Sequence, residues 1–85
     1  MSDKIYELRA DQCRAARALL GWSRDELAKR SKVSNATLAD FEAGKRTPYD
    51  RTLADIQKAL EEAGIQFIPE NGGGAGVRFK DRSGD

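Results

Sequence analysis

The stretch RDELAKRSKVSNATLADFEAGKRTP, residues 24–48, decides the fold of this 85-residue chain. It holds two short amphipathic segments that meet at residues 31–33, and a basic Gly-Lys-Arg turn follows the second. A serine precedes each segment, where its hydroxyl can accept a hydrogen bond from a free amide of a helix N-terminus. Glu26 would complete a capping box with the first serine, and two apolar pairs form hydrophobic staples, Trp22 with Leu27 and Val33 with Leu38. The stretch therefore predicts two helices of about two turns each, joined by a tight turn.

The flanking sequence predicts a helix on each side of this stretch and a hairpin after them. Residues 10–20 are rich in helix formers and end at Gly21. In the segment that follows Pro48, apolar residues recur at helical spacing up to Gly64, namely Leu53, Ile56, Leu60 and Ala63. The last part changes period: IQFIPE alternates, VRFK is short, and glycines separate them, which is typical of a β-hairpin. Residues 1–9 contain too few apolar positions to choose between a short strand and an arm.

Composition argues against catalysis and against a metal or cofactor site. The chain has no histidine and a single cysteine, Cys13, so neither a zinc site nor a nucleophile–histidine pair can be assembled. Cys13 is expected to be a small core residue. The glycine-rich NGGGAG at 71–76 lacks the Lys-Ser/Thr ending of a phosphate-binding loop and is interpreted as a flexible turn. No apolar run is long enough to span a membrane and no signal peptide follows Met1, so a cytoplasmic location is expected.

The charge distribution is more informative than the net charge of +1. Residues 9–51 contain ten Lys or Arg and six Asp or Glu, which gives them a net charge of +4 and leaves −3 on the remainder. Such a polarised chain can present one basic face to a polyanion, although a solvated surface would have the same composition.

Taken together, these segments resemble the XRE family of helix-turn-helix proteins, relatives of the phage Cro and repressor proteins, over roughly residues 10–63. The positions that carry the resemblance are Arg17, GWSRDELA at 21–28, VS at 33–34, Leu38, Glu42, GKRTP at 44–48 and Leu53. Two positions depart from the family pattern. Lys32 stands in the turn where glycine is frequent, at a cost of about 1 kcal/mol for a left-handed backbone. Arg24 stands where glutamine is common.

The resemblance implies a mainly α fold, with a four-helix repressor-like helix-turn-helix domain at residues 10–63. An N-terminal arm or short strand (1–9) precedes it, and a C-terminal β-hairpin and tail (64–85) follow. It also implies that Glu42 forms a structural ion pair with Arg17. If that pair is buried, removing one partner leaves a buried charge unpaired, at a cost of about 3–5 kcal/mol.

The helical segment 34–43 has an outward face made mostly of alanine, which suits a helix that enters the DNA major groove. By the resemblance, its base-contacting positions are Ser34, Asn35, Ala36 and Asp40. Asparagine can pair with adenine through two hydrogen bonds, and aspartate can accept one from cytosine. The alternative is a solvated helix filled with alanine for its helix propensity alone.

With few base contacts available, contacts to the DNA backbone must supply much of the affinity. The predicted phosphate-contacting residues are Ser23, Arg24, Thr37, Lys45 and Arg46, with Arg51 as a further candidate. The alternative for the Lys45–Arg46 turn is a basic turn that serves only solubility.

The leading functional hypothesis is a sequence-specific regulator of transcription that binds double-stranded DNA as a homodimer and represses by occupying its operator. A second is an antitoxin-type module that binds operator DNA and also a partner protein. A third, an adaptor that has lost DNA binding, is disfavoured by the retained basic residues. The apolar residues of the hairpin must pack on something, because an isolated hairpin is marginally stable. They can cover the domain's own helices or contact a second subunit, and the dimer is the favoured interpretation.

Overall fold

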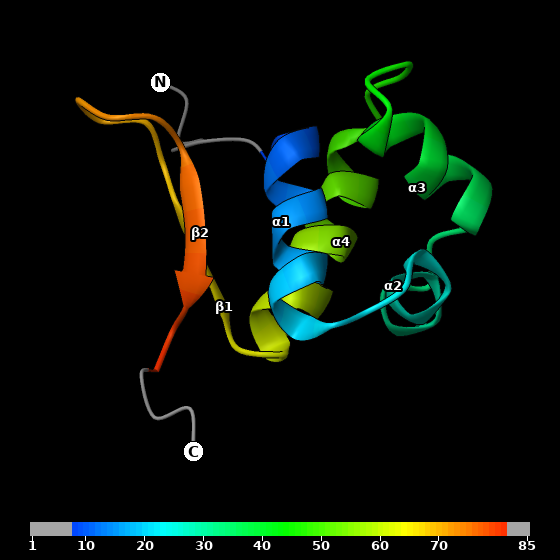
Figure 1. Ribbon diagram of the computed structural model, residues 1–85. Helices are drawn as coiled ribbons and strands as arrows, with labels where there is room; N and C mark the ends of the chain where they lie inside the picture. Colours follow the sequence, from blue (N-terminus) through cyan, green and yellow to red (C-terminus); the bar gives the residue numbers. More distant parts are fainter. Residues whose placement is uncertain (1–7, 82–85) are drawn as a thin grey trace.

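The computed structural model describes residues 8–81 and confirms a mainly α fold with four helices and a C-terminal hairpin (Figure 1). The elements follow in the order α1 (Ala10–Leu20), α2 (Arg24–Ser31), α3 (Asn35–Glu42), α4 (Asp50–Glu62), β1 (Ile65–Ile68) and β2 (Gly76–Phe79). The arm or short strand expected at residues 1–9 lies, except for Leu8 and Arg9, outside the described residues. None of the helices within residues 8–81 is long and apolar enough to cross a membrane.

The serines before α2 and α3 cap these helices as predicted. Ser23 Oγ accepts a hydrogen bond from the Glu26 amide at 3.0 Å, and Ser34 Oγ accepts one from the Thr37 amide at 3.1 Å. The predicted capping box is half formed, because the Glu26 carboxylate pairs with Arg30 one turn later at 2.7 Å. The Arg30 guanidinium also lies 4.8 Å from the centre of the Trp22 ring, so it links α2 to the segment that precedes the helix.

The turn between α2 and α3 has the left-handed backbone that was expected of Lys32. Its φ is 62°, and among the described residues it is the only one other than glycine that has a positive φ. The exposed lysine side chain imposes no clash, and its amide donates to the Ala28 carbonyl at 2.8 Å. The hydrogen bond closes α2 and offsets part of the backbone cost, so the turn keeps its geometry without glycine.

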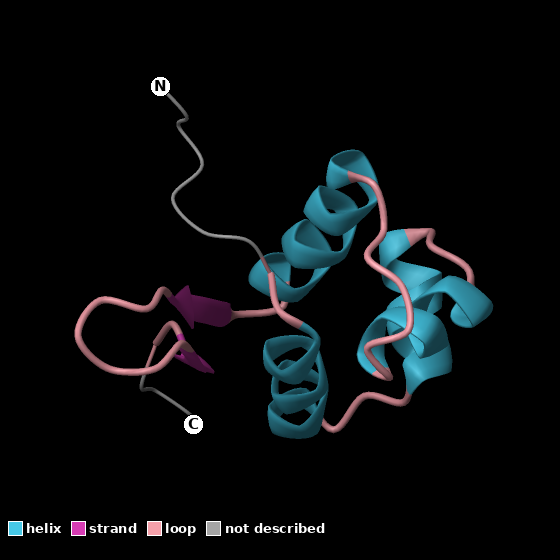
Figure 2. Cartoon of the chain, turned by 90° about the horizontal axis from the view of Figure 1, so that it is seen from above, coloured by secondary structure: helices cyan, strands magenta, loops and turns pink. Residues whose placement is uncertain are grey.

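One core joins all four helices to the hairpin. Its largest fully buried side chains are Leu27, Leu38, Ile56, Leu60 and Ile65, which come from α2, α3, α4 and β1. In space, α1 and α4 lie between the other elements, with the hairpin on one side and the α2–α3 pair on the other (Figures 1 and 2). The hairpin is therefore remote from the outward face of α3.

The hairpin packs within the chain, which is the first of the two arrangements considered from the sequence. Cross-strand partners point to the same face, and Ile65 and Phe67 of β1 are buried against the helices with Val77 of β2 half-buried beside them. Gln12 of α1 donates from Nε2 to the Gly76 carbonyl at 3.0 Å and more weakly to that of Ile68. The opposite face carries Arg78, hydrogen-bonded to Gln66 at 2.8 Å, and the half-buried Ile68 opposite Gly76.

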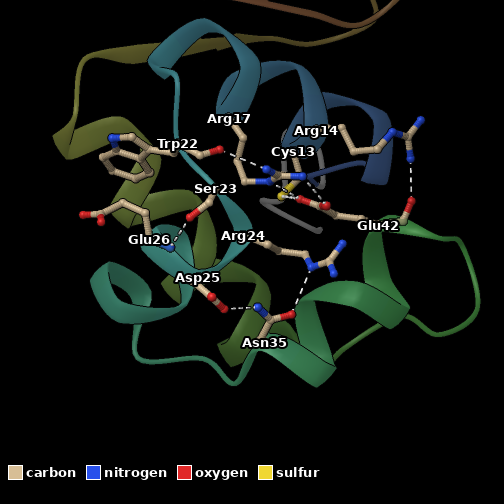
Figure 3. A network of polar contacts seen from close by, with 10 residues as sticks. All are labelled: Cys13, Arg14, Arg17, Trp22, Ser23, Arg24, Asp25, Glu26, Asn35 and Glu42. Atoms are coloured by element: carbon tan, nitrogen blue, oxygen red, sulfur yellow. Dashed lines mark hydrogen bonds and ion pairs between the residues drawn. The ribbon is translucent and has the colours of Figure 1, made fainter.

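A buried ion pair ties α1 to the end of α3 (Figure 3). Arg17 donates from Nε and Nη2 to the two carboxylate oxygens of Glu42, each at 2.8 Å, and from Nη1 to the Trp22 carbonyl at 2.9 Å. The Cys13 thiol donates to the same carboxylate at 3.2 Å, and Arg14 donates to the Glu42 carbonyl. Glu42 is 4% exposed. Within residues 8–81, each buried side-chain nitrogen and oxygen has a partner, and this network supplies those of Glu42.

The protonation equilibria of this network follow its geometry. Burial by itself would raise the pKa of Glu42, but the hydrogen bonds from Arg17 and Cys13 and the charge of Arg17 outweigh it and hold the pKa below its ordinary 4.5. The pKa of the Cys13 thiol is raised well above its usual range, mainly by burial and secondly by the hydrogen bond to Glu42. Cys13 is fully buried, which confirms the expectation that it is a small core residue.

Replacing Glu42 by alanine should lower the free energy of unfolding by about 3 kcal/mol, which is the low end for a broken buried ion pair. The low end applies because the Arg17 side chain keeps 19% of its surface exposed. Urea unfolding of the variant and of the exposed control Glu62→Ala measures the difference. Equal small losses in both variants would contradict a structural role for the pair.

The contribution of Glu42 to stability should also depend on pH in a defined direction. Because its folded pKa lies below 4.5, the contribution is fully present above that pH and is lost as the pH falls through the folded pKa. The stability difference between the parent and Glu42→Gln should therefore shrink on acidification from about pH 7 to about pH 3. The other carboxylates are the same in both proteins, so their contributions to the pH dependence cancel. Urea unfolding across this range tests it, and a difference that stays constant would contradict the expected direction.

Candidate nucleic-acid interface

Helix α3 presents an outward face of short side chains. Leu38 and Phe41 are buried in the core, while Ala36 and Ala43 are exposed and Asp40 is half-buried. Figure 1 shows α3 at the side of the molecule opposite the hairpin. Leu38 and Phe41 thus lie on the core side of the helix, and short side chains on its other side would let it approach another surface closely.

Asn35, the first residue of α3, is held between two residues of α2 (Figure 3). Arg24 donates from Nε to the Asn35 side-chain carbonyl at 3.0 Å, and Asn35 Nδ2 donates to the Asp25 carboxylate. Asn35 is half-buried, whereas Arg24 and Asp25 are exposed. The N-terminal ends of the two helices therefore form one polar cluster, which we call the Arg24–Asp25–Asn35 cluster.

The hydroxyls predicted to contact DNA already serve the fold. Ser23 and Ser34 are the N-caps described above, and Ser34 Oγ also donates to Thr37 Oγ1 at 2.9 Å. Ser23 and Ser34 are exposed and Thr37 is half-buried. A hydroxyl that accepts from an amide keeps a second lone pair, and its proton can turn toward a phosphate. These residues thus combine a capping role with availability at the surface.

The basic turn after α3 has an ordered backbone and exposed side chains. Gly44 has φ 76°, and the Lys45 amide donates to the Asp40 carbonyl at 2.9 Å, which closes the end of α3. Lys45 and Arg46 are exposed. Arg46 and Thr37 line one groove of about 370 Å³ together with Thr47, Pro48, Tyr49 and Thr52. The structure therefore brings two of the predicted phosphate-contacting residues together.

The remaining predicted residue lies further along the chain. Arg51 is exposed on the first turn of α4, two residues beyond Tyr49, the N-cap of that helix. Tyr49 makes no side-chain capping bond and is 88% exposed. A tyrosine as N-cap leaves the first amides of α4 without the side-chain acceptor that serine or aspartate would supply.

Three residues of this region were not singled out from the sequence. An acid in the first turn of a helix, such as Asp25, fits the helix dipole and gives no sign of a partner on another helix. Arg14 contacts the Glu42 carbonyl, and Tyr49 lines the groove beside Arg46. These contacts join residues that are distant in sequence or lie on different elements, so no local sequence pattern predicts them.

Comparison with known proteins agrees with this geometry. A family model described as helix-turn-helix matches residues 14–64, which is more than half of the chain and includes all four helices in whole or in part. No curated protein matches the chain. The match, the tight α2–α3 turn and the free face of α3 lead to one conclusion: the chain belongs to the XRE family of helix-turn-helix proteins, which are DNA-binding regulators of transcription.

Proposed function

We propose that this chain is a cytoplasmic, sequence-specific repressor that inserts α3 into the major groove of its operator. The observation that carries the proposal is the free face of α3, where one amide side chain, Asn35, stands at the N-terminus above small alanines. In a helix-turn-helix the N-terminal residues of the second helix contact base edges, and the first helix crosses the DNA backbone. Repression then follows from occupation of the operator.

The proposed base contacts are few. Asn35 supplies a donor and an acceptor for adenine, Asp40 an acceptor for cytosine, and Ser34 a hydroxyl, while the Ala36 methyl suits a thymine methyl. Asp40 lies one turn or more beyond Asn35 along α3, so the two side chains would contact different base pairs. Sequence preference is therefore expected at a small number of positions.

Phosphate contacts would flank α3 on both sides. Ser23 and Arg24 lie at the N-terminus of α2. On the other side, Thr37 of α3 and Arg46 line one groove, Lys45 lies in the turn after α3, and Arg51 lies on the first turn of α4. Their positive charges supply sequence-independent affinity and hold the helix in register. The ordered backbone of the turn supports this role for Lys45 and Arg46, because less conformational entropy is lost on binding.

A homodimer formed through the hairpin could occupy two half-sites, which for helix-turn-helix dimers lie about 34–36 Å apart. Phe79 supports this arrangement, because it is 46% exposed although its cross-strand partner Ile65 is buried. The sheet has two strands, so within the described chain each strand has an outer edge without a ladder partner. Pairing between two subunits would cover one of these edges on each sheet.

An antitoxin-type role differs from simple repression by its partner. Purification of the chain from its native cell would separate the two, because an antitoxin would be recovered in a stoichiometric complex with a second protein. Recovery of the chain with copies of itself alone supports the repressor.

Replacing Lys45 or Arg46 by alanine should weaken binding to all duplexes by a similar factor. It should also flatten the dependence of log K on log salt by about one unit per lost phosphate contact. Titrations of a fluorescent duplex at several salt concentrations measure both quantities, with the exposed Lys58 of α4 as the control site. An unchanged slope in both variants would remove the turn from the interface.

Replacing Asn35 by alanine should relax preference at one base position, at a cost of about 1–3 kcal/mol for the preferred base. Binding to unrelated duplexes should change little, because the backbone contacts remain. Selection of bound sequences from random duplexes, run at one stated salt concentration, gives the preferences of both proteins. Identical preferences would show that Asn35 contacts no base.

The full chain should be a dimer at micromolar concentration or on its operator, and Phe79→Glu should shift it toward monomer. Light scattering measures the mass, and Gln66→Glu, which adds the same charge on the polar face of the hairpin, should leave it unchanged. Deletion of residues 65–85 is a poor test, because Ile65 and Phe67 belong to the core. A parent chain that is monomeric both free and on DNA would refute the dimer.

A further inference from the structure

The amide of Asn35 has two neighbours that can each play only one hydrogen-bonding role. The Arg24 guanidinium has donors and no acceptor, and it approaches the side-chain oxygen at 3.0 Å. The ionised Asp25 carboxylate has acceptors and no donor, and it receives the Nδ2 proton. Oxygen and nitrogen of an asparagine amide are similar in size, so the neighbours decide which way the group faces. Here both neighbours require the same orientation.

Turning the amide over would replace both hydrogen bonds by repulsive contacts. The carbonyl oxygen would face the Asp25 carboxylate, and the NH₂ group would face the Arg24 guanidinium. If Asp25 were absent, Arg24 alone would set the orientation through a single exposed hydrogen bond, which water can replace at little cost.

We propose that Asp25 is a positioning residue for base selection, which together with Arg24 locks the Asn35 amide in the orientation that matches adenine. The inference rests on the proposed contact of Asn35 with a base. An asparagine amide has two N–H donors and an oxygen with two lone pairs, and the two neighbours use one of each. One N–H and one lone pair remain, which is the set that the N7 acceptor and N6 donor of adenine require.

The charge of Asp25 provides a second signature. An exposed carboxylate beside the proposed DNA surface repels phosphates, so its removal should strengthen binding to every duplex. The same removal should weaken discrimination at the base that Asn35 contacts. These two changes have opposite effects on specific binding: the first would follow the loss of any exposed carboxylate at this surface, and the second identifies the positioning role.

The experiment compares Asp25→Asn with the parent chain on four duplexes. One duplex carries the site that the parent selects from random DNA. The other three carry the alternative base pairs at the position that Asn35 is proposed to contact. An Asn–adenine pair gives a preference of about 5- to 150-fold. We expect D25N to lower this preference at least threefold, because asparagine at position 25 can donate or accept and so permits both amide orientations. The preference is a ratio within one variant, so any change in its folded fraction cancels.

Two further variants serve as controls. Glu26→Gln removes one negative charge from the same turn of α2, but Glu26 pairs with Arg30, so the base preference should stay at the parental value. Asp25→Glu keeps an acceptor-only side chain and should retain more of the preference than D25N does. In the double variant D25N/N35A, the preference should equal that of N35A alone.

The outcomes separate the inference from the function on which it rests. If N35A relaxes the preference and D25N leaves it at the parental value, Asp25 has no positioning role and the base contact of Asn35 stands. If N35A leaves the preference unchanged, the base contact itself is wrong and the inference falls with it. A reduced preference in both D25N and E26Q would assign the effect to charge and would also overturn the inference.

Discussion

The buried pair between Arg17 and Glu42 is the interaction on which the placement of α3 depends. It joins the last turn of α1 to the last residue of α3, shortly before Lys45 and Arg46 in the turn. A buried ion pair contributes little net stability compared with well-packed apolar residues, but a single partner left alone is costly. The pair therefore acts mainly by excluding other positions of the helix, since any shift that separates the two groups leaves a charge buried.

The two ends of α3 are held with different strength. Its C-terminal end is fixed by Glu42, which is buried and bonded by Arg17 and Cys13. Its N-terminal end is bonded through the Asn35 side chain to Arg24 and Asp25, which are exposed. The buried end thus keeps the register of the helix, while the two exposed neighbours are proposed to set the orientation of the Asn35 amide. The hairpin lies on the opposite side of the α1–α4 pair, so the contacts proposed for dimerisation do not compete with those for DNA (Figure 2).

The helices were predictable because their signals are local. Caps at Ser23 and Ser34, stops at Gly21 and Gly44, and the apolar stripe of α4 each involve residues within a few positions of one another. The Arg17–Glu42 pair is a long-range contact and was available only through the resemblance to a family. The side on which the hairpin packs was open, because Ile65 and Phe67 suit the domain's own core as well as a partner. Glu26 was assigned to a capping box, but a guanidinium one turn later is a stronger partner for its carboxylate. The role of Asp25 depends on the angle between α2 and α3, which no local pattern encodes.

The most direct test of the account is a titration of isotope-labelled protein with the duplex selected from random DNA, followed by NMR. The account predicts the largest shifts at the backbone amides of α3 and of the turn at residues 44–46, together with the side-chain amide of Asn35. The exposed side of α4 near Lys58 should shift little. Large shifts confined to α4 and the hairpin, with α3 unchanged, would contradict the claim that α3 is the surface that binds DNA.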